Sequence, residues 1–273
     1  MLLDAHFHPL SLANSTPNST NDCATHLNSI IKGVGASACP QEWETLRKWS
    51  CRYKQPFILG LHPWLAEVLA TDPQGETKLK SYLSSLDQKL RSFPYPCAVG
   101  EIGFDKVHSR QPNFVWQNKL FTAQYRLAQK YSLPIVIHCV KSYGHLFDAL
   151  SELSCQLKEP QPQGLIHAFW GTPELALRLI KLNFYISLNS KLLMKISSST
   201  ANTEKQKLAA LAKVIPLTKL LLESDAPWGV SSSASLRELS YFLAPYWSAS
   251  AKQLQEICHS NLHIFYNLPA DTE

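Results

Sequence analysis

The feature that most constrains the fold is an alternation of short apolar runs with longer segments of helical periodicity. Runs such as LPIVIH and KLLLES are continuously apolar and lack the alternation of a half-exposed strand, which is typical of strands buried on both faces. We interpret such runs as strands at residues 2–6, 33–38, 57–62, 97–101, 134–138, 164–167, 184–188 and 219–223.

Segments with helical spacing separate most of these runs. In one of them, Leu120, Ala123 and Leu127 recur close to the period of an α-helix. Another starts at Pro173, which suits the first turn of a helix, directly after Thr172, a residue type that caps helix N-termini. We predict helices at residues 41–54, 75–93, 113–131, 143–157, 173–182, 204–214, 233–243, 249–258 and 261–266.

This order of strands and helices predicts an α/β fold, specifically a (β/α)8 TIM barrel in one domain that spans residues 1–273. A doubly wound open sheet would give a similar pattern, and periodicity alone does not separate the two folds, although the number of strands favours the barrel. The chain has 273 residues, 45% of them apolar, which suits a barrel of ordinary size.

Composition restricts the compartment more than it restricts the substrate. The N-terminus has neither the basic nor the long apolar stretch of a signal peptide, and no window approaches ~18 uninterrupted apolar residues, so we expect a cytoplasmic protein without a membrane partner. The 7 cysteines are odd in number and form no C-x-x-C pair, which indicates free thiols. The formal charge of +5 is scattered, so a polyanionic partner is compatible with it but not required.

Histidines and carboxylates gather at the ends of the predicted strands. In a barrel, the carboxyl ends of all strands open on the same face, where barrel enzymes place their chemistry. The residues in question are His6 and His8 on the first strand, His62 on the third, Glu101 on the fourth, His138 on the fifth, His167 on the sixth and Asp225 just past the eighth.

These residue types suit divalent cations, because imidazole nitrogens and carboxylate oxygens are ligands of Zn, Mn and Mg. In an extended H-x-H segment, His6 and His8 point to the same side and can hold one ion. Individually, His138 could be a buried core histidine and Asp225 could cap a turn. Their shared position at strand ends favours a metal-dependent hydrolase in which two divalent cations (Mg, Mn or Zn) activate a water.

At these residues the sequence resembles the TatD family of metal-dependent hydrolases, which are TIM barrels of the amidohydrolase superfamily. The matching stretches are LLDAHFHPL, LGLHPW, VGEIGFD, LPIVIHCV, LIHAFWGT and LLLESDAPW. They occur in the family's order and span residues 2 to 228, and it is their combination that is specific.

The resemblance implies a set of metal ligands and a substrate. One cation would be held by His6, His8 and Asp225, the other by His138 and His167, with Glu101 bridging the two. Asp225, Glu101 and His62 would be catalytic: Asp225 contacts the attacking water, and His62 lies beside the metals and contacts the substrate phosphate. Glu223 would lie at the edge of the site, with its role left open. The family's activity implies a DNase, resembling a single-strand exonuclease, with DNA or another phosphodiester as substrate.

The sequence departs from the family pattern at two places that would contact phosphate. Val140 and Lys141 follow the fifth-strand histidine where an Arg is common, and Lys141 can replace it only as a point charge. After Trp228, the loop with Arg-Asn and Pro that many members carry is missing. Trp170 and Trp228 follow strand ends and could stack on bases, although packing at the barrel mouth explains them equally well.

Two other functions fit the same residues. One is hydrolysis of an amide, lactone or phosphomonoester in a small molecule, because the fold alone does not select the chemistry. The other is a barrel that works as a subunit of a larger assembly, although its protein partners cannot be identified from the sequence. The native metal, the polarity of exonuclease action and the oligomeric state are left open as well.

Overall fold

The computed structural model describes residues 2–10, 32–93, 96–156, 160–196, 201–226 and 233–269. Its strands follow the chain in the order β1 to β8, neighbouring strands pair in parallel, and helices connect most of them. This α/β arrangement is the topology of a (β/α)8 barrel, so the predicted fold class is confirmed. The chain divides into two compact units, which are described in turn; the assignment of residues 1–273 to one domain stays a prediction.

Every predicted strand is present, with ends that differ by a few residues. The strands are β1 (Asp4–Phe7), β2 (Gly33–Ala36), β3 (Phe57–Leu59), β4 (Pro96–Asp105), β5 (Ile135–Val140), β6 (Gly164–Ile166), β7 (Tyr185–Asn189) and β8 (Leu220–Glu223). The largest difference concerns β4, which continues to Asp105. The prediction that Glu101 ends this strand is therefore wrong, because Glu101 lies in its middle.

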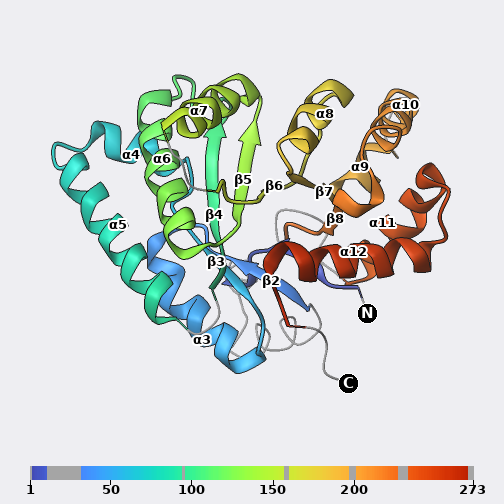
Figure 1. Cartoon of the computed structure of the whole chain (residues 1–273), viewed down its shortest axis with the longest axis horizontal. Helices are drawn as coiled ribbons and strands as arrows, with labels where there is room; N and C mark the ends of the chain where they lie inside the picture. The colour runs from blue at the N-terminus through green and yellow to red at the C-terminus, as the bar shows by residue number, and fades with distance from the viewer. Residues whose placement is uncertain are drawn as a thin grey trace. The chain divides into compact units, whose positions relative to one another are not determined.

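Unit 2 comprises Ala36–Arg52 and Pro56–Gly164. In it, β4 lies between β3 and β5, and α6 (Phe114–Tyr131) packs against β4 (Figure 1). The other helices of this unit are α3 (Trp43–Tyr53), α4 (Leu65–Thr71), α5 (Gly75–Ser92) and α7 (Tyr143–Gln156).

An irregularity in β4 sets the direction of its functional side chains. Val99 pairs with Ile135 but Ile102 pairs with Ile137, so β4 contains one more residue than β5 over this stretch. Gly103 follows with φ +139°, a conformation that L side chains rarely adopt. Such bulges re-aim side chains next to active sites, and Glu101 lies within this one.

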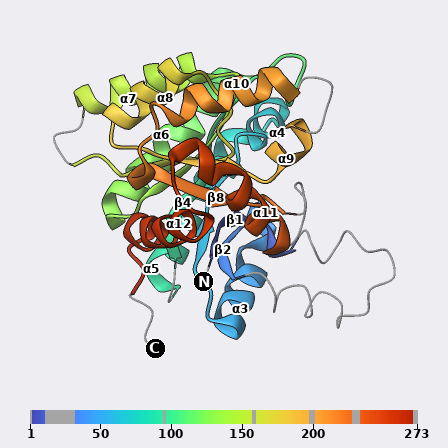
Figure 2. The ribbon, with the colours of Figure 1, turned by 90° about the vertical axis from the view of Figure 1, so that its right-hand side faces the viewer.

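Unit 1 comprises Met1–Gly35, Tyr53–Gln55 and Leu165–Glu273. Here β7 lies between β6 and β8, β1 pairs with β2, and α12 (Ala251–Tyr266) packs against β8. The remaining helices are α8 (Pro173–Lys181), α9 (Lys191–Ile196), α10 (Ala201–Ala212) and α11 (Ser233–Leu243). Figure 2 shows α8 and α10 side by side. Within the described residues, no helix is both long and apolar enough to cross a membrane.

Two features of the helices differ from the prediction. Residues 249–258 and 261–266 were expected to form separate helices, but α12 is continuous from its capping box at Ser250 to Asn267. The misleading signal is Asn261, a polar residue on the buried face, whose amide donates to the carbonyls of Leu217 and Leu220. The short helices α4 and α9 were not predicted at all, because 7 and 6 residues are too few to show a clear period.

Candidate functional site

Four of the predicted metal ligands lie together in unit 1. His6 belongs to β1 and His8 follows it, while His167 follows β6 and Asp225 follows β8. Ligand atoms of His6, His167 and Asp225 lie within 4.8 Å of one another. Nε2 of His8 is 3.7 Å from Oδ1 of Asp225. All four side chains are buried, so they form a compact group of nitrogen and oxygen ligands.

Asp4, the first residue of β1, connects this strand to Ser224, which directly follows β8. Its carboxylate accepts hydrogen bonds from the backbone N–H groups of His6 (3.1 Å) and Ser224 (3.0 Å) and from the Ser224 hydroxyl. The backbone N–H of Asp225 donates to the carbonyl of His6 at 3.0 Å. Burial raises the pKa of Asp4 to about 7, although the hydrogen bonds from Ser224 and His6 oppose this rise. These bonds fix His6 and Asp225 relative to each other.

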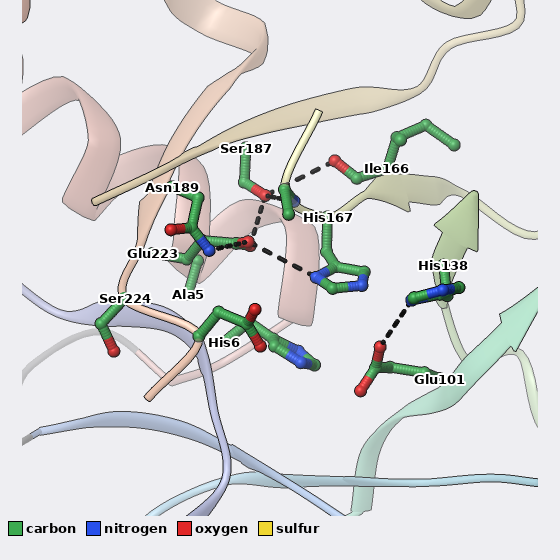
Figure 3. Close-up of polar contacts among 12 residues, drawn as sticks. Ala5, His6, Glu101, His138, Ile166, His167, Ser187, Asn189, Glu223 and Ser224 are labelled. Atoms are coloured by element: carbon green, nitrogen blue, oxygen red, sulfur yellow. Dashed lines mark hydrogen bonds and ion pairs between the residues drawn. The ribbon is translucent and has the colours of Figure 1, made fainter. Parts of the chain in front are cut away.

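Glu223, at the end of β8, holds His167 from behind (Figure 3). Its Oε1 lies 3.4 Å from Nδ1 of His167 and accepts from the Asn189 amide at 3.4 Å, and its Oε2 accepts from the Ser187 hydroxyl. Because Nδ1 of His167 faces this carboxylate, Nε2 is the nitrogen that is available to a cation. The structure thus gives Glu223 a place beside His167, which the sequence leaves open.

The pKa of Glu223 shows which interactions decide its charge. Burial by itself would raise this pKa, because the carboxylate is completely enclosed. The hydrogen bond and charge of His167, the charge of His6 and the hydrogen bond from Ser187 together lower it below the ordinary value. A buried but ionised Glu223 is a suitable partner for a histidine whose other nitrogen binds a cation.

The remaining predicted catalytic and metal-ligand residues lie together in unit 2. His62 follows β3, while Glu101 is in β4 and His138 in β5. Ligand atoms of these three side chains lie within 4.8 Å of one another. Oε2 of Glu101 is 3.6 Å from Nε2 of His62 and 3.4 Å from Nδ1 of His138, and Figure 3 shows the latter contact. All three are buried.

Asp105 orients a histidine in unit 2, as Glu223 does in unit 1. Its Oδ2 lies 3.0 Å from Nε2 of His138 and accepts from the Trp64 indole at 2.8 Å. Its Oδ1 accepts from the backbone N–H groups of Val107 (2.7 Å) and His108 (3.0 Å). Although burial opposes it, this set of hydrogen bonds holds the pKa of Asp105 well below its usual range. The carboxylate is therefore an ionised acceptor for His138.

Hydrogen bonds distinguish the two histidines that lie beside Glu101. Because Nε2 of His138 faces the ionised Asp105, that nitrogen carries the proton and Nδ1 presents its lone pair toward Glu101. In His62 the relation is reversed: Nδ1 accepts from the backbone N–H of Trp64 at 3.3 Å, so the proton of the neutral ring is on Nε2. His138 is thus arranged as a metal ligand and His62 as a hydrogen-bond donor.

Two residues at the strand ends were missed from the sequence. Asp105 lies inside the VGEIGFD stretch, but β4 was expected to end at Glu101, so its position at the true strand end was hidden. Lys191 follows β7, one of the two strands for which no site residue was predicted, and its Nζ lies 3.1 Å from Oδ2 of Asp225. The signal was present in the sequence: in ISLNSK, the residues ISLN belong to β7 and Lys191 follows two positions after its end. The reasoning that identified the other strand-end residues would also have identified Lys191.

The predicted substrate-binding residues are placed less uniformly. Lys141 is exposed at the end of β5, and Trp170 is half-buried after β6. Trp228 lies outside the described residues. Trp64 is 42% exposed and stacks on the ring of His108, with centroids 4.2 Å apart.

The donor atoms of both units suit divalent cations of the Mg, Mn and Zn group. They are imidazole nitrogens and carboxylate oxygens, and a histidine in each unit is oriented through its second nitrogen by an ionised carboxylate. Cys139, next to His138, has its pKa raised to about 12 by burial and so offers no thiolate. The side chains therefore fit the metals that the sequence suggested.

Comparison with known proteins supports the same conclusion. The family profile described as TatD related DNase matches residues 3–267. The chain is similar to YjjV of Escherichia coli, an uncharacterized metal-dependent hydrolase (30% identity; 62% of this chain and 57% of that protein). It is also similar to deoxyribonuclease Tat-D of Schizosaccharomyces pombe (26% identity; 73% and 60%). The aligned part of the chain thus spans less than two thirds of either relative.

A solved structure supports the fold. The crystal structure of YjjV, described as a TatD homolog, superposes with a TM-score of 0.76 and covers 98% of each chain. At 22% sequence identity this likeness concerns the backbone architecture, and it agrees with the barrel topology of β1 to β8.

Proposed function

Because the chain belongs to the TatD-related DNase family of metal-dependent hydrolases, we propose that it hydrolyses phosphodiester bonds in DNA, from an end of a single strand. The observation that supports this most directly is the pairing of an outer carboxylate with a ligand histidine in each unit. Glu223 faces Nδ1 of His167, and Asp105 faces Nε2 of His138. Histidines that bind a metal commonly donate their second ring N–H to a carboxylate in this way.

Divalent cations at these residues would activate a water as nucleophile and neutralise charge on the phosphoryl oxygens. The chain provides the ligands and fixes their direction before the cations bind. The ligands are His6, His8, Glu101, His138, His167 and Asp225.

Two side chains have roles toward the reacting groups. Nε2 of His62 carries the proton of a neutral ring, so it donates a hydrogen bond to a phosphoryl oxygen as charge develops there. Asp225 contacts the attacking water and is placed to accept its proton. Its backbone is held by the carbonyl of His6, which keeps the carboxylate in position.

The test is cleavage of single-stranded DNA, labelled at the 5′ end in one assay and at the 3′ end in another, in the presence of Mg, Mn or Zn. We expect stepwise shortening of the strand by the wild-type chain and loss of that activity in Glu101→Gln, which keeps the size of the side chain but removes its charge. Glu238→Gln is the matched control, because Glu238 is an exposed residue of α11. It should cleave as the wild type does.

Bis-p-nitrophenyl phosphate separates the remaining outcomes. Cleavage of this small diester without any cleavage of DNA would contradict the DNase proposal and favour a small-molecule substrate. If neither compound is cleaved with any of the three metals, phosphodiester hydrolysis itself is excluded.

A further inference from the structure

The lysine missed at the end of β7 has a fixed position. The backbone N–H of Lys191 donates to Oδ1 of Asn189 at 2.7 Å, and its ammonium contacts Asp225 at 3.1 Å. Asn189 is in turn bound to Glu223. Lys191 is therefore tied by both its backbone and its side chain to the residues around the proposed metal ligands of unit 1.

Two further lysines lie around the ring of Trp170. Nζ of Lys195 is 5.1 Å and Nζ of Lys207 is 4.6 Å from the ring centroid, and Lys207 also donates to the carbonyl of Trp170 at 2.7 Å. The indole N–H donates to Glu204 at 2.9 Å. Trp170 thus connects α9, which carries Lys195, with α10, which carries Lys207 and Glu204, and these helices pack together (Figure 1).

Within the described part of the chain, these three lysines act on one another in series, and two carboxylates attract them. Lys191 contacts Asp225, and Glu204 attracts both Lys195 and Lys207. Burial lowers the pKa of Lys195 and of Lys207, and the repulsion of the neighbouring lysine lowers each further. The attraction between an ammonium group and an anionic ligand is stronger where the cation is partly removed from water, and the ligand also relieves the repulsion between neighbouring lysines.

The position of Asp225 strengthens this charge argument. In the proposed function the Asp225 carboxylate binds a cation. Its negative charge then neutralises the ammonium group of Lys191 less than in the metal-free chain. A phosphate is a ligand that an ammonium group binds well. The excess of positive charge then extends from the metal ligands along α9 to Trp170.

We infer that Lys191, Lys195 and Lys207 bind the phosphates of a single-stranded DNA substrate. Trp170 positions the ammonium groups of Lys195 and Lys207. The inference deepens the proposed function and rests on it for the identity of the substrate. It supplies phosphate contacts that the sequence lacks elsewhere, at Val140 and after Trp228. Trp170 contributes to substrate binding mainly through the lysines on its ring.

Direct binding of a fluorescent single-stranded oligonucleotide in EDTA tests the inference without catalysis. Affinity should fall as salt rises, and each lysine that neutralises a phosphate contributes about 0.7 to the slope of log K against log salt. We expect Lys195→Gln and Lys207→Gln each to reduce that slope by about 0.7, and Lys191→Gln to reduce it less, because Asp225 pairs with Lys191 when no cation is bound. The triple variant should reduce the slope by at least about 1.4.

Lys213→Gln is the matched control, since it removes the same charge from an exposed lysine directly after α10. It should bind as the wild type does. Far-UV circular dichroism and thermal melting must show that the variants are folded. If the folded triple variant keeps the wild-type slope, or if Lys213→Gln lowers the slope as much as Lys207→Gln, the inference is wrong.

Kinetics with two substrates separate failure of this inference from failure of the proposed function. The double variant Lys195→Gln/Lys207→Gln, which keeps the contact of Lys191 with Asp225, should raise KM for an oligonucleotide. Its kcat and its cleavage of bis-p-nitrophenyl phosphate should stay close to wild type, because the small diester has only the reacting phosphate. If no diester is cleaved at all, the proposed function fails, yet the binding experiment still decides whether these lysines bind DNA. A KM for the oligonucleotide that does not change would overturn the inference.

Discussion

Oδ2 of Asp105 lies 3.0 Å from Nε2 of His138, and the remaining hydrogen bonds of that carboxylate come from the Trp64 indole and two backbone N–H groups. The side chain of Gln117 makes two hydrogen bonds to the backbone of Asp105: it accepts from the N–H at 2.9 Å and donates to the carbonyl at 3.0 Å. Asp105 is therefore an immobile acceptor, which decides which nitrogen of His138 is protonated.

Replacing Asp105 by Asn should weaken metal binding without unfolding the protein. The amide keeps the size of the side chain but no longer offers an ionised acceptor to His138, so Nδ1 loses basicity and its fixed direction. We expect a loss of about 10–100-fold in metal affinity, measured by isothermal titration with Zn or Mn. Asp148→Asn, at an exposed position of α7, should bind as the wild type does. Equal affinities of Asp105→Asn and wild type would show that this carboxylate does not orient a ligand.

Loss of charge at Glu223 should cost stability as well as metal affinity. In Glu223→Gln the new NH2 group replaces either Oε1, which accepts from the Asn189 amide, or Oε2, which accepts from the Ser187 hydroxyl. In either orientation an acceptor is lost and a buried hydrogen bond is disrupted. We expect the free energy of unfolding to fall by about 1–3 kcal/mol, measured by urea denaturation of the metal-free chain. Ser187→Ala removes the donor to Oε2 and the acceptor of the Ala168 backbone N–H, so it should also lower the free energy of unfolding while Glu223 stays ionised. A Glu223→Gln variant as stable as the wild type would contradict the role of this network.

His62 should act on the rate and leave metal content unchanged. His62→Gln keeps an amide near the position of Nε2 but changes its reach and direction toward the substrate. We expect kcat/KM for bis-p-nitrophenyl phosphate to fall about 100-fold, as for removal of one donor to a developing oxyanion. Metal content by plasma mass spectrometry should equal that of the wild type. A variant that loses one equivalent of metal would instead identify His62 as a ligand.

The fold was predictable because its signal is repeated along the chain. Several of the buried strands, such as β3, β5 and β8, contain continuous apolar runs, so they could be found without knowledge of their neighbours. Strand ends were less certain, because the polar residues that end an apolar run are the same ones that line a site. In β4 the apolar run stops at Glu101, yet pairing with β5 carries the strand on to Asp105. Pairing between strands is a non-local property that the run does not contain.

The candidate site was predictable to the extent that it depends on strand ends. His6, His138, His167 and Asp225 were found in this way. The structure places His167 and Asp225 just past the ends of β6 and β8 and His6 one residue before the end of β1, but His138 lies inside β5, which continues to Val140. The contacts that orient them were not predictable. Glu223 reaches His167 and Asp105 reaches His138 from different strands, over 56 and 33 positions in the chain respectively. Periodicity and motif spacing carry no information about such pairs.

The thiols provide a test of burial that is independent of the site. Cys97 and Cys258 are buried, and burial raises the pKa of both thiols, which lowers the thiolate fraction at any given pH. Cys51 and Cys155 are exposed. We expect a thiol reagent such as DTNB, near neutral pH, to react quickly with the exposed pair and slowly with Cys97 and Cys258. In the Cys51→Ser/Cys155→Ser variant the fast phase should shrink by two thiols. Fast labelling of Cys97 in the native protein, mapped by mass spectrometry, would contradict the burial described.

Gly103 should tolerate no side chain, because a Cβ at this position would lie 2.1 Å from the carbonyl oxygen of His138 and φ is +139°. Neither cause can be relieved without moving β4 relative to β5, which would displace Glu101 and Asp105 together. We expect Gly103→Ala to lower the free energy of unfolding by about 2 kcal/mol or more, measured by urea denaturation.

Gly144→Ala is the matched control for this substitution. Gly144 lies in α7, a Cβ added to it would meet nothing within 4 Å, and its φ is an ordinary one for L residues. Alanine there should stabilise the chain by about 0.4–1 kcal/mol, since it restricts the unfolded backbone and favours the helix. The two variants are therefore expected to have effects of opposite sign. If Gly103→Ala were as stable as Gly144→Ala, the backbone of β4 could not have the conformation that places Glu101 and Asp105 on either side of His138.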